Sequence, residues 1–164
     1  MGLILEKERE MKKRVLGTIL TEDDRAPNKH GLRRKQTDKV FLIVKKPRSE
    51  NSWGFPTALL PTNPTKQFRE HTRDGLSETV DFEHGKYFMF GNHPFASYSY
   101  EFSDEVKKTL KVFGTKLFFY KGCIHGGSVK LKKNFKDHAW VTRDELKDYI
   151  DDPKMYTLLE QITH

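Results

Sequence analysis

The sequence contains little cysteine and no long hydrophobic run. Its single cysteine, Cys123, excludes an internal disulfide and any zinc site built from several thiolates. The longest apolar stretches, 40–44 and 117–120, are strand-sized and fall well short of the roughly 18 residues that span a bilayer. We therefore expect a soluble protein of a reducing compartment that has no membrane partner.

The N-terminus lacks a recognisable targeting segment. It shows no secretory pattern, and Glu6, Glu8 and Glu10 conflict with the acid-poor composition of a mitochondrial presequence. Any import signal is expected to lie outside this sequence or to be of an unusual kind.

Basic residues exceed acidic ones. The 164 residues include 30 Lys and Arg against 23 Asp and Glu, which gives a net charge of +7. Lys and Arg that neutralise phosphates release bound counterions, so this balance favours a polyanionic partner, above all nucleic acid. A basic surface that serves solubility alone is the alternative.

The chain length fits one domain with appendages. We expect residues 1–37 to form an N-terminal extension and basic linker, and residues 38–164 to form the folded domain with a C-terminal helix. Within the extension, Leu3 to Leu20 has the pattern of an exposed helix that leans on another surface. Residues 25–39 have almost nothing to bury, which is typical of a linker or contact loop.

The folded domain is expected to begin with a strand at Val40 to Val44, whose continuous apolar character indicates burial on both faces. A short strand follows at Trp53 to Pro56. Asn63 then precedes a proline and predicts a helix start at Pro64.

That helix should run to about Leu76, with Phe68, Thr72 and Leu76 on its inner face. We further predict strands at 87–90, 98–102 and 116–120, turns at 91–94 and 126–127, a helix that starts from a capping box at 142–145, a terminal amphipathic helix carrying Met155, Leu158, Leu159 and Ile162, and a core that includes Trp53, Phe118 and Trp140.

The Trp-x-Phe-Pro strand end, a loop, and a helix rich in Glu, Asp and Arg together resemble the Nudix family over about Val40 to Ile150. The family motif opens with Gly, passes a Glu, and continues with Arg-Glu, an apolar residue, any residue, Glu-Glu and a final Gly. In Nudix hydrolases these carboxylates hold magnesium against a diphosphate. The resemblance implies an α+β fold in which a mixed sheet is sandwiched between helices.

The matching stretch here, Arg73 to Val80, departs from the motif. Asp74 replaces Glu, Ser77 replaces the first of the paired Glu residues, and Val80 replaces the final Gly. Upstream, Ala58 or Leu59 stands at the opening Gly, and the loop Glu falls near Pro64. Because magnesium demands near-ideal oxygen ligands, we expect no catalysis.

Glu70, Asp74 and Glu78 still lie four residues apart on one helical face. They could bind a cation, but the favoured interpretation is a solvated face neutralised by Arg69 and Arg73.

Within the superfamily the sequence resembles most a degenerate branch formed by proteins of the mitochondrial large ribosomal subunit. The segments that carry this resemblance are Trp53 to Pro56, Thr72 to Leu76, Phe90 to Pro94, Tyr98 to Phe102, Gly114 to Lys121 and Trp140 to Leu146. The resemblance implies a ribosome-bound, non-catalytic protein of the mitochondrial matrix. Its neighbours would be ribosomal proteins and rRNA around the central protuberance.

The rRNA contacts that we expect come from two basic clusters, which are Lys29, Arg33, Arg34 and Lys35 before the domain and Lys130, Lys132 and Lys133 after the 126–127 turn. The histidines show no metal-ligand spacing, and Cys123 with His125 does not suggest a nucleophile, so we predict no metal, cofactor or small-molecule substrate. Two rival functions are a magnesium-dependent hydrolase of nucleoside diphosphate derivatives that uses Glu70, Asp74 and Glu78, and a free RNA-binding regulatory module.

Overall fold

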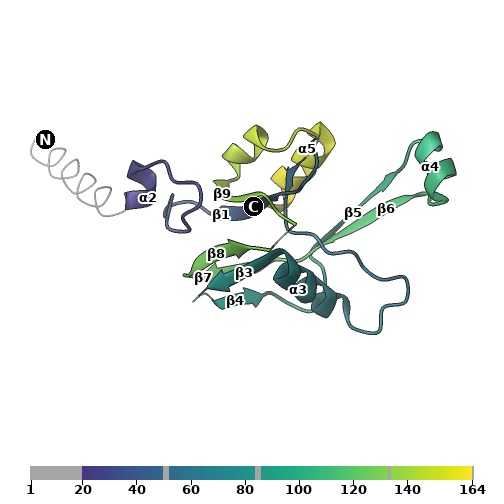
Figure 1. The fold of residues 1–164 in the computed structure, drawn as a ribbon, viewed down its shortest axis with the longest axis horizontal. Coiled ribbons are helices and arrows are strands. Elements are labelled where there is room, and N and C mark those ends of the chain that lie inside the picture. Colours follow the sequence, from purple (N-terminus) through teal and green to yellow (C-terminus); the bar gives the residue numbers. More distant parts are fainter. Residues whose placement is uncertain (1–19, 50–51, 84–85, 133, 164) are drawn as a thin grey trace, which may run out of the picture.

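The computed structural model describes residues 20–49, 52–83, 86–132 and 134–163 (Figure 1). The helix predicted at Leu3 to Leu20 lies almost wholly outside these residues. The elements in chain order are α2 (Glu22–Arg25), β1 (Val40–Lys45), β2 (Trp53–Gly54), α3 (Phe68–Thr79), β3 (Val80–Glu83), β4 (Lys86–Met89), β5 (Ala96–Glu101), α4 (Asp104–Leu110), β6 (Gly114–Phe119), β7 (Gly122–His125), β8 (Ser128–Leu131), β9 (Asp137–Thr142), the 3-10 helix η1 (Asp144–Asp148) and α5 (Pro153–Ile162).

Strand β1 is the centre of a three-stranded antiparallel sheet in the order β2-β1-β9. It pairs with β9 along its whole length, from Val40 opposite Thr142 to Lys45 opposite Asp137. Ile43 and Val44 are both fully buried although successive side chains of a strand point to opposite faces. The strand predicted at Val40 to Val44, buried on both faces, is therefore confirmed.

Strands β3 to β8 form a long two-stranded antiparallel ribbon. The chain runs outward through β3, β4 and β5 and returns through β6, β7 and β8, and the pairs β5 with β6, β4 with β7, and β3 with β8 are nested. One register holds from Val80 opposite Leu131 to Met89 opposite Gly122. Beyond it, the six residues 90–95 lie opposite the two residues 120–121, so the register shifts before β5 and β6.

The ribbon gives the molecule its elongated outline. In Figure 1, β5 and β6 extend away from the sheet and carry α4 at their far end, opposite the N-terminal side. The α+β class predicted from the sequence is confirmed. Every strand pair among the described residues is antiparallel, however, so the parallel pairing expected of one mixed sheet is not seen in that part of the chain.

Helix α3 begins four residues later than predicted. Its N-cap is Gln67, which forms a capping box with Glu70, so Asn63 and Pro64 belong to the preceding loop. The predicted inner face is also wrong in part, because Phe68 is exposed while Gly75 and Thr79 are buried. A side chain at position 75 would overlap the Cβ of Ala58, so the missing side chain lets the loop pack directly on the helix.

The C-terminal elements cover the β1–β9 sheet. The helix predicted after Thr142 is a five-residue 3-10 helix, η1, closed by i to i+3 bonds such as Leu146 N to Arg143 O at 3.2 Å. The predicted terminal helix is α5, which begins with Asp152 as N-cap and Pro153 in the first turn, residues that favour these positions. Its Leu159 joins Ile43, Val141 and Leu146 in the core.

Predicted core positions divide between the sheet and the ribbon. Trp140, on β9, is 5% exposed, and Trp53 packs against the core from its edge. Phe118 is 38% exposed, so its assignment to the core was wrong. It lies on β6, where the ribbon is only two strands wide, and its neighbour Phe119 packs against the core instead.

No helix in the described part of the chain is both long and apolar enough to cross a membrane.

We predict that Trp140→Ala lowers the free energy of unfolding by about 3 to 5 kcal/mol, because it removes a buried aromatic ring and leaves a cavity. The measurement is urea denaturation of the purified chain. Phe118→Ala is the matched control and should cost clearly less, since much of that ring is already in water. Equal losses in the two variants would show that the ribbon is as well packed as the sheet.

Candidate functional site

Helix α3 holds the residues aligned with the metal-binding carboxylates of Nudix hydrolases. Asp74 accepts a hydrogen bond from Lys66 Nζ at 2.7 Å, and this contact lowers the pKa of Asp74. The same contact raises the pKa of Lys66. The Asp74 carboxylate is thus neutralised by a lysine of the preceding loop, a partner that the sequence did not indicate.

The other two acidic residues of this helix face, Glu70 and Glu78, do not share the contact between Asp74 and Lys66. Glu70 accepts from the backbone N of Gln67 at 3.4 Å as part of the helix cap, and Glu78 is exposed. Arg69 turns to the carbonyl of Met89 at 3.3 Å rather than to a carboxylate. The carboxylates of Glu70, Asp74 and Glu78 are not close enough together to share one metal ion in the part of the chain that the structure describes.

Arg34 is 6% exposed and does not project into solvent. Its two terminal nitrogens donate to the two carboxylate oxygens of Glu145 at 2.6 and 2.7 Å, and one of them also donates to the carbonyl of Trp140 at 2.6 Å. Glu145 further accepts from the backbone N of Thr142 at 2.9 Å. The expectation that Arg34 reaches rRNA is corrected, because its charge is already used inside the chain.

Glu145 is strongly stabilised as a carboxylate. The hydrogen bond from Arg34, with smaller contributions from the Thr142 backbone and from nearby positive charge, lowers its pKa from 4.5 to about 2 although burial acts in the opposite direction. Two parallel N–H to O bonds between a guanidinium and a carboxylate give both strength and a fixed orientation.

The segment before β1 is attached to the domain at further points. The carbonyl of Lys29 accepts from the backbone N of Trp140 at 2.8 Å, and the Lys29 ammonium lies 4.8 Å from the ring centroid of Tyr149. A hydrogen bond with Tyr149 raises the pKa of Lys29. Residues 25–39 were expected to have almost nothing to bury, and the contacts of Lys29 and Arg34 correct that expectation. The segment is a docked part of the domain.

The remaining basic candidates lie on the surface. Arg33 and Lys35 are exposed, and the backbone N of Lys35 donates to Asp24 at 2.8 Å, which fixes the turn that presents them. Lys130 lies 3.5 Å from a carboxylate oxygen of Glu83, and Lys132 is exposed. Lys133 lies outside the described residues.

The structure also brings together His30, Asp137 and His138, a group that sequence analysis missed. His30 is 107 positions from Asp137, and adjacent strand residues normally point to opposite faces, so no spacing rule signals the cluster. Cys123 and His125 do share one strand face as expected, with the sulfur 3.7 Å from Nε2.

Comparison with known proteins gives both sequence relatives and a structural neighbour. No protein-family model matches the chain. It is 29% identical over 136 residues to the large ribosomal subunit protein mL46 of Bos taurus, with 82% of this chain and 47% of that protein covered. The proteins of the same name from Rattus norvegicus and Mus musculus are each 25% identical over 135 residues, with 82% of this chain and 47% and 46% of theirs covered. The chain therefore spans about half the length of these relatives.

Among solved structures, the chain is similar to the dihydroneopterin triphosphate pyrophosphohydrolase of E. coli. The TM-score is 0.54 with 10% sequence identity, over 76% of this chain and 85% of that one. At this identity the likeness concerns the fold alone, and it confirms the Nudix-like architecture predicted from the sequence.

We predict that Glu145→Gln destabilises the chain by about 2 to 4 kcal/mol at neutral pH, because it leaves the buried Arg34 charge without its partner. Asp74→Asn, which removes a solvent-exposed ion pair, is the matched control and should change stability little. Urea denaturation at pH 7 measures both effects.

The stabilisation should also depend on pH in a defined window. A carboxylate whose pKa is lowered on folding contributes fully above its unfolded value, 4.5, and loses the contribution as the pH falls toward about 2. The stability difference between the wild type and Glu145→Gln should therefore shrink over that range. A difference that stayed constant down to the lower limit would contradict the assigned pKa.

Proposed function

We propose that this chain is a non-catalytic structural component of the mitochondrial large ribosomal subunit. The observation that carries the proposal is the similarity, over most of the chain, to proteins named as large ribosomal subunit protein mL46. Mitochondrial, ribosome-bound localisation follows from the same similarity and from the resemblance carried by the sequence segments. Because the relatives are about twice as long, the proposal concerns the part of them that the chain matches.

The arrangement of acids on α3 supports a non-catalytic role. A magnesium site for a diphosphate needs several carboxylates that converge on one ion. Here Asp74 pairs with Lys66, Glu70 serves the helix cap, and Ser77 stands where the motif has a glutamate. The position aligned with the loop glutamate, near Pro64, also carries no carboxylate.

Exposed apolar side chains support the proposal that partner molecules cover part of this chain in an assembly. Isolated proteins rarely leave large aromatic side chains gathered in water, and such patches mark contact surfaces. Phe113, at the far end of the ribbon beside α4, is 85% exposed. The other exposed apolar residues of the ribbon and its tip are Phe88, Phe90, Phe95, Tyr100, Leu110, Val112 and Phe118.

We infer that ribosomal proteins cover the ribbon and that rRNA phosphates meet the basic surface, with the central protuberance as the expected location. The exposed candidates for phosphate contact are Arg33, Lys35, Lys130 and Lys132, to which Lys133 is added from the sequence. Backbone contacts of this kind are sequence-independent and weaken as salt is raised. Arg34 is no longer a candidate because it pairs with Glu145, and the Lys29 ammonium already contacts the Tyr149 ring.

We expect the purified chain to show no turnover of nucleoside diphosphate derivatives in magnesium or manganese, because its carboxylates do not converge. A coupled phosphate or pyrophosphate-release assay measures this. Metal-dependent turnover that disappeared in Glu78→Gln would establish the rival function, a Nudix hydrolase.

We also expect the tip of the ribbon to be needed for assembly. Phe113→Ser should reduce the fraction of tagged chain that migrates with the large subunit when mitochondrial lysate is separated on a sucrose gradient. Leu59→Ser is the matched control, since Leu59 is 96% exposed but lies in the loop before α3. Both variants remove one exposed apolar side chain, so a difference between them isolates the ribbon.

Three results would count against parts of the proposal. Wild-type chain that stays at the top of the gradient at low salt would exclude a stable ribosomal component, and RNA binding without co-migration would favour the free regulatory module. Equal incorporation of Phe113→Ser and the wild type would place the contact surface elsewhere on the domain.

A further inference from the structure

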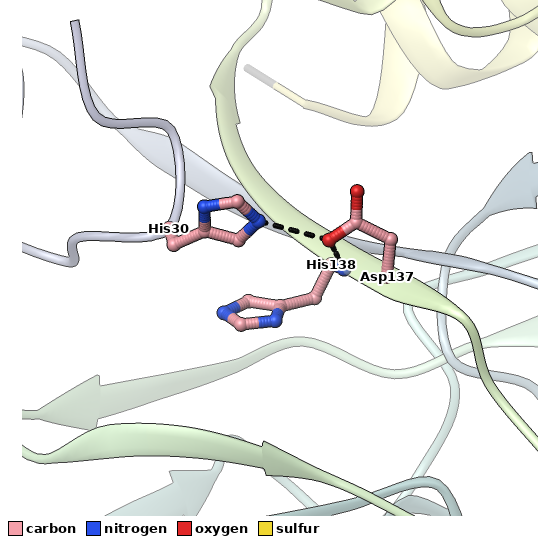
Figure 2. Close-up of side chains that lie close together, drawn as sticks. All are labelled: His30, Asp137 and His138. Atoms are coloured by element: carbon pink, nitrogen blue, oxygen red, sulfur yellow. Dashed lines mark hydrogen bonds and ion pairs between the residues drawn. The ribbon is translucent and has the colours of Figure 1, made fainter.

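His30, Asp137 and His138 meet where the segment before β1 crosses the start of β9 (Figure 2). His30 Nε2 lies 2.8 Å from Asp137 Oδ1, and one ligand atom from each of the three residues lies within 4.8 Å of the others. The ring centroids of His30 and His138 are 5.0 Å apart at an interplanar angle of 67°. Two imidazoles and a carboxylate thus converge on one small volume.

Local backbone geometry explains how two consecutive strand residues can face one site. Asp137 is the first residue of β9, and its side chain folds back so that Oδ1 accepts from the backbone N of His138 at 2.8 Å. The carboxylate therefore turns toward the His138 side of the strand, as Figure 2 shows. The remaining oxygen, Oδ2, takes part in none of these bonds.

We propose that His30, Asp137 and His138 form a binding site for a divalent transition-metal ion, with Zn²⁺ as the ion that this ligand set suits. Zinc takes imidazole nitrogen and carboxylate oxygen at about 2.0 to 2.2 Å, with four ligands in a tetrahedron. Three protein ligands leave one position for water. This inference is independent of the ribosomal proposal, and it departs from the sequence-based prediction of no metal site.

The surroundings suit a cation. Lys45, the cross-strand partner of Asp137, directs its ammonium over the Trp53 ring at 5.7 Å from the centroid. The side-chain partner of the Asp137 carboxylate within the part of the chain that the structure describes is the His30 ring. Ligands of one zinc ion lie roughly 3.3 Å apart, so the 2.8 Å contact between His30 and Asp137 would lengthen and any wider separation, up to 4.8 Å, would shorten. His30 and Asp137 are exposed enough to make these adjustments.

A bound ion would join the same two parts of the chain that Arg34 joins. His30 lies between Lys29 and Arg34 in the docked segment, and Asp137 and His138 precede Trp140 in β9. An ion that binds the folded chain and not the unfolded one raises its stability by mass action. The site is therefore expected to fasten the segment to the sheet.

The test is titration of the full chain, free of any affinity tag, with ZnCl₂ in competition with a chromophoric chelator. We expect one equivalent to bind, a rise in the melting temperature that a chelator reverses, and at least about tenfold weaker binding in His30→Ala and in Asp137→Asn. His93→Ala, a change at an exposed histidine outside the cluster, is the control and should bind as the wild type does. Circular dichroism of the metal-free variants checks that each is folded.

Cys123 and His125 are the alternative metal site, and Co²⁺ binding distinguishes them from the proposed one. Co²⁺ bound through a thiolate gives a sulfur-to-metal charge-transfer band, which the proposed nitrogen and oxygen site lacks. Binding that is lost in Cys123→Ser and kept in His30→Ala would overturn the proposal, as would the absence of zinc binding to the folded wild type.

Discussion

The arrangement of the N-terminal segment, β9 and η1 depends on the guanidinium of Arg34. It meets the carboxylate of Glu145 with both terminal nitrogens and the carbonyl of Trp140 with one of them. A charge this deeply buried is tolerated because both terminal nitrogens are hydrogen-bonded, and it becomes costly as soon as one partner is removed. The contact therefore sets where the chain runs before β1, which in turn places Lys29 on Tyr149 and His30 beside Asp137.

The rest of the molecule divides into a covered sheet and an uncovered ribbon. The core gathers around β1 and β9, where η1 and α5 supply the packing layer. From Val80 to Leu131 the chain is two strands wide, and a two-stranded sheet has marginal stability in water without a surface to pack against. The many exposed aromatic side chains of the ribbon support the proposal that other molecules pack against it.

Sequence patterns predicted the local elements better than their partners. The apolar run at β1, the proline-ended β2, the aromatic strands β4, β5 and β6, and the apolar spacing of α5 all carried local signals. No sequence signal indicated the nested pairing of the ribbon, because β3, β7 and β8 are short and lie between polar residues. Arg34 and His30 looked like solvated linker residues, since their partners lie more than a hundred positions away. On α3, the loop lysine that neutralises Asp74 was likewise invisible to helical spacing.

Nested pairing makes the ribbon a spacer whose length can change without disturbing the sheet. Adding one residue to β5 and one to β6 would move α4 outward by about 3.4 Å. The core residues Ile43, Val141 and Leu146 would keep their neighbours. A single added pair would also turn the far side chains to the opposite face, whereas two pairs would preserve their orientation. The reach of Phe113 from the sheet is thus adjustable in steps of about 7 Å, and the residues that close the core place no limit on it.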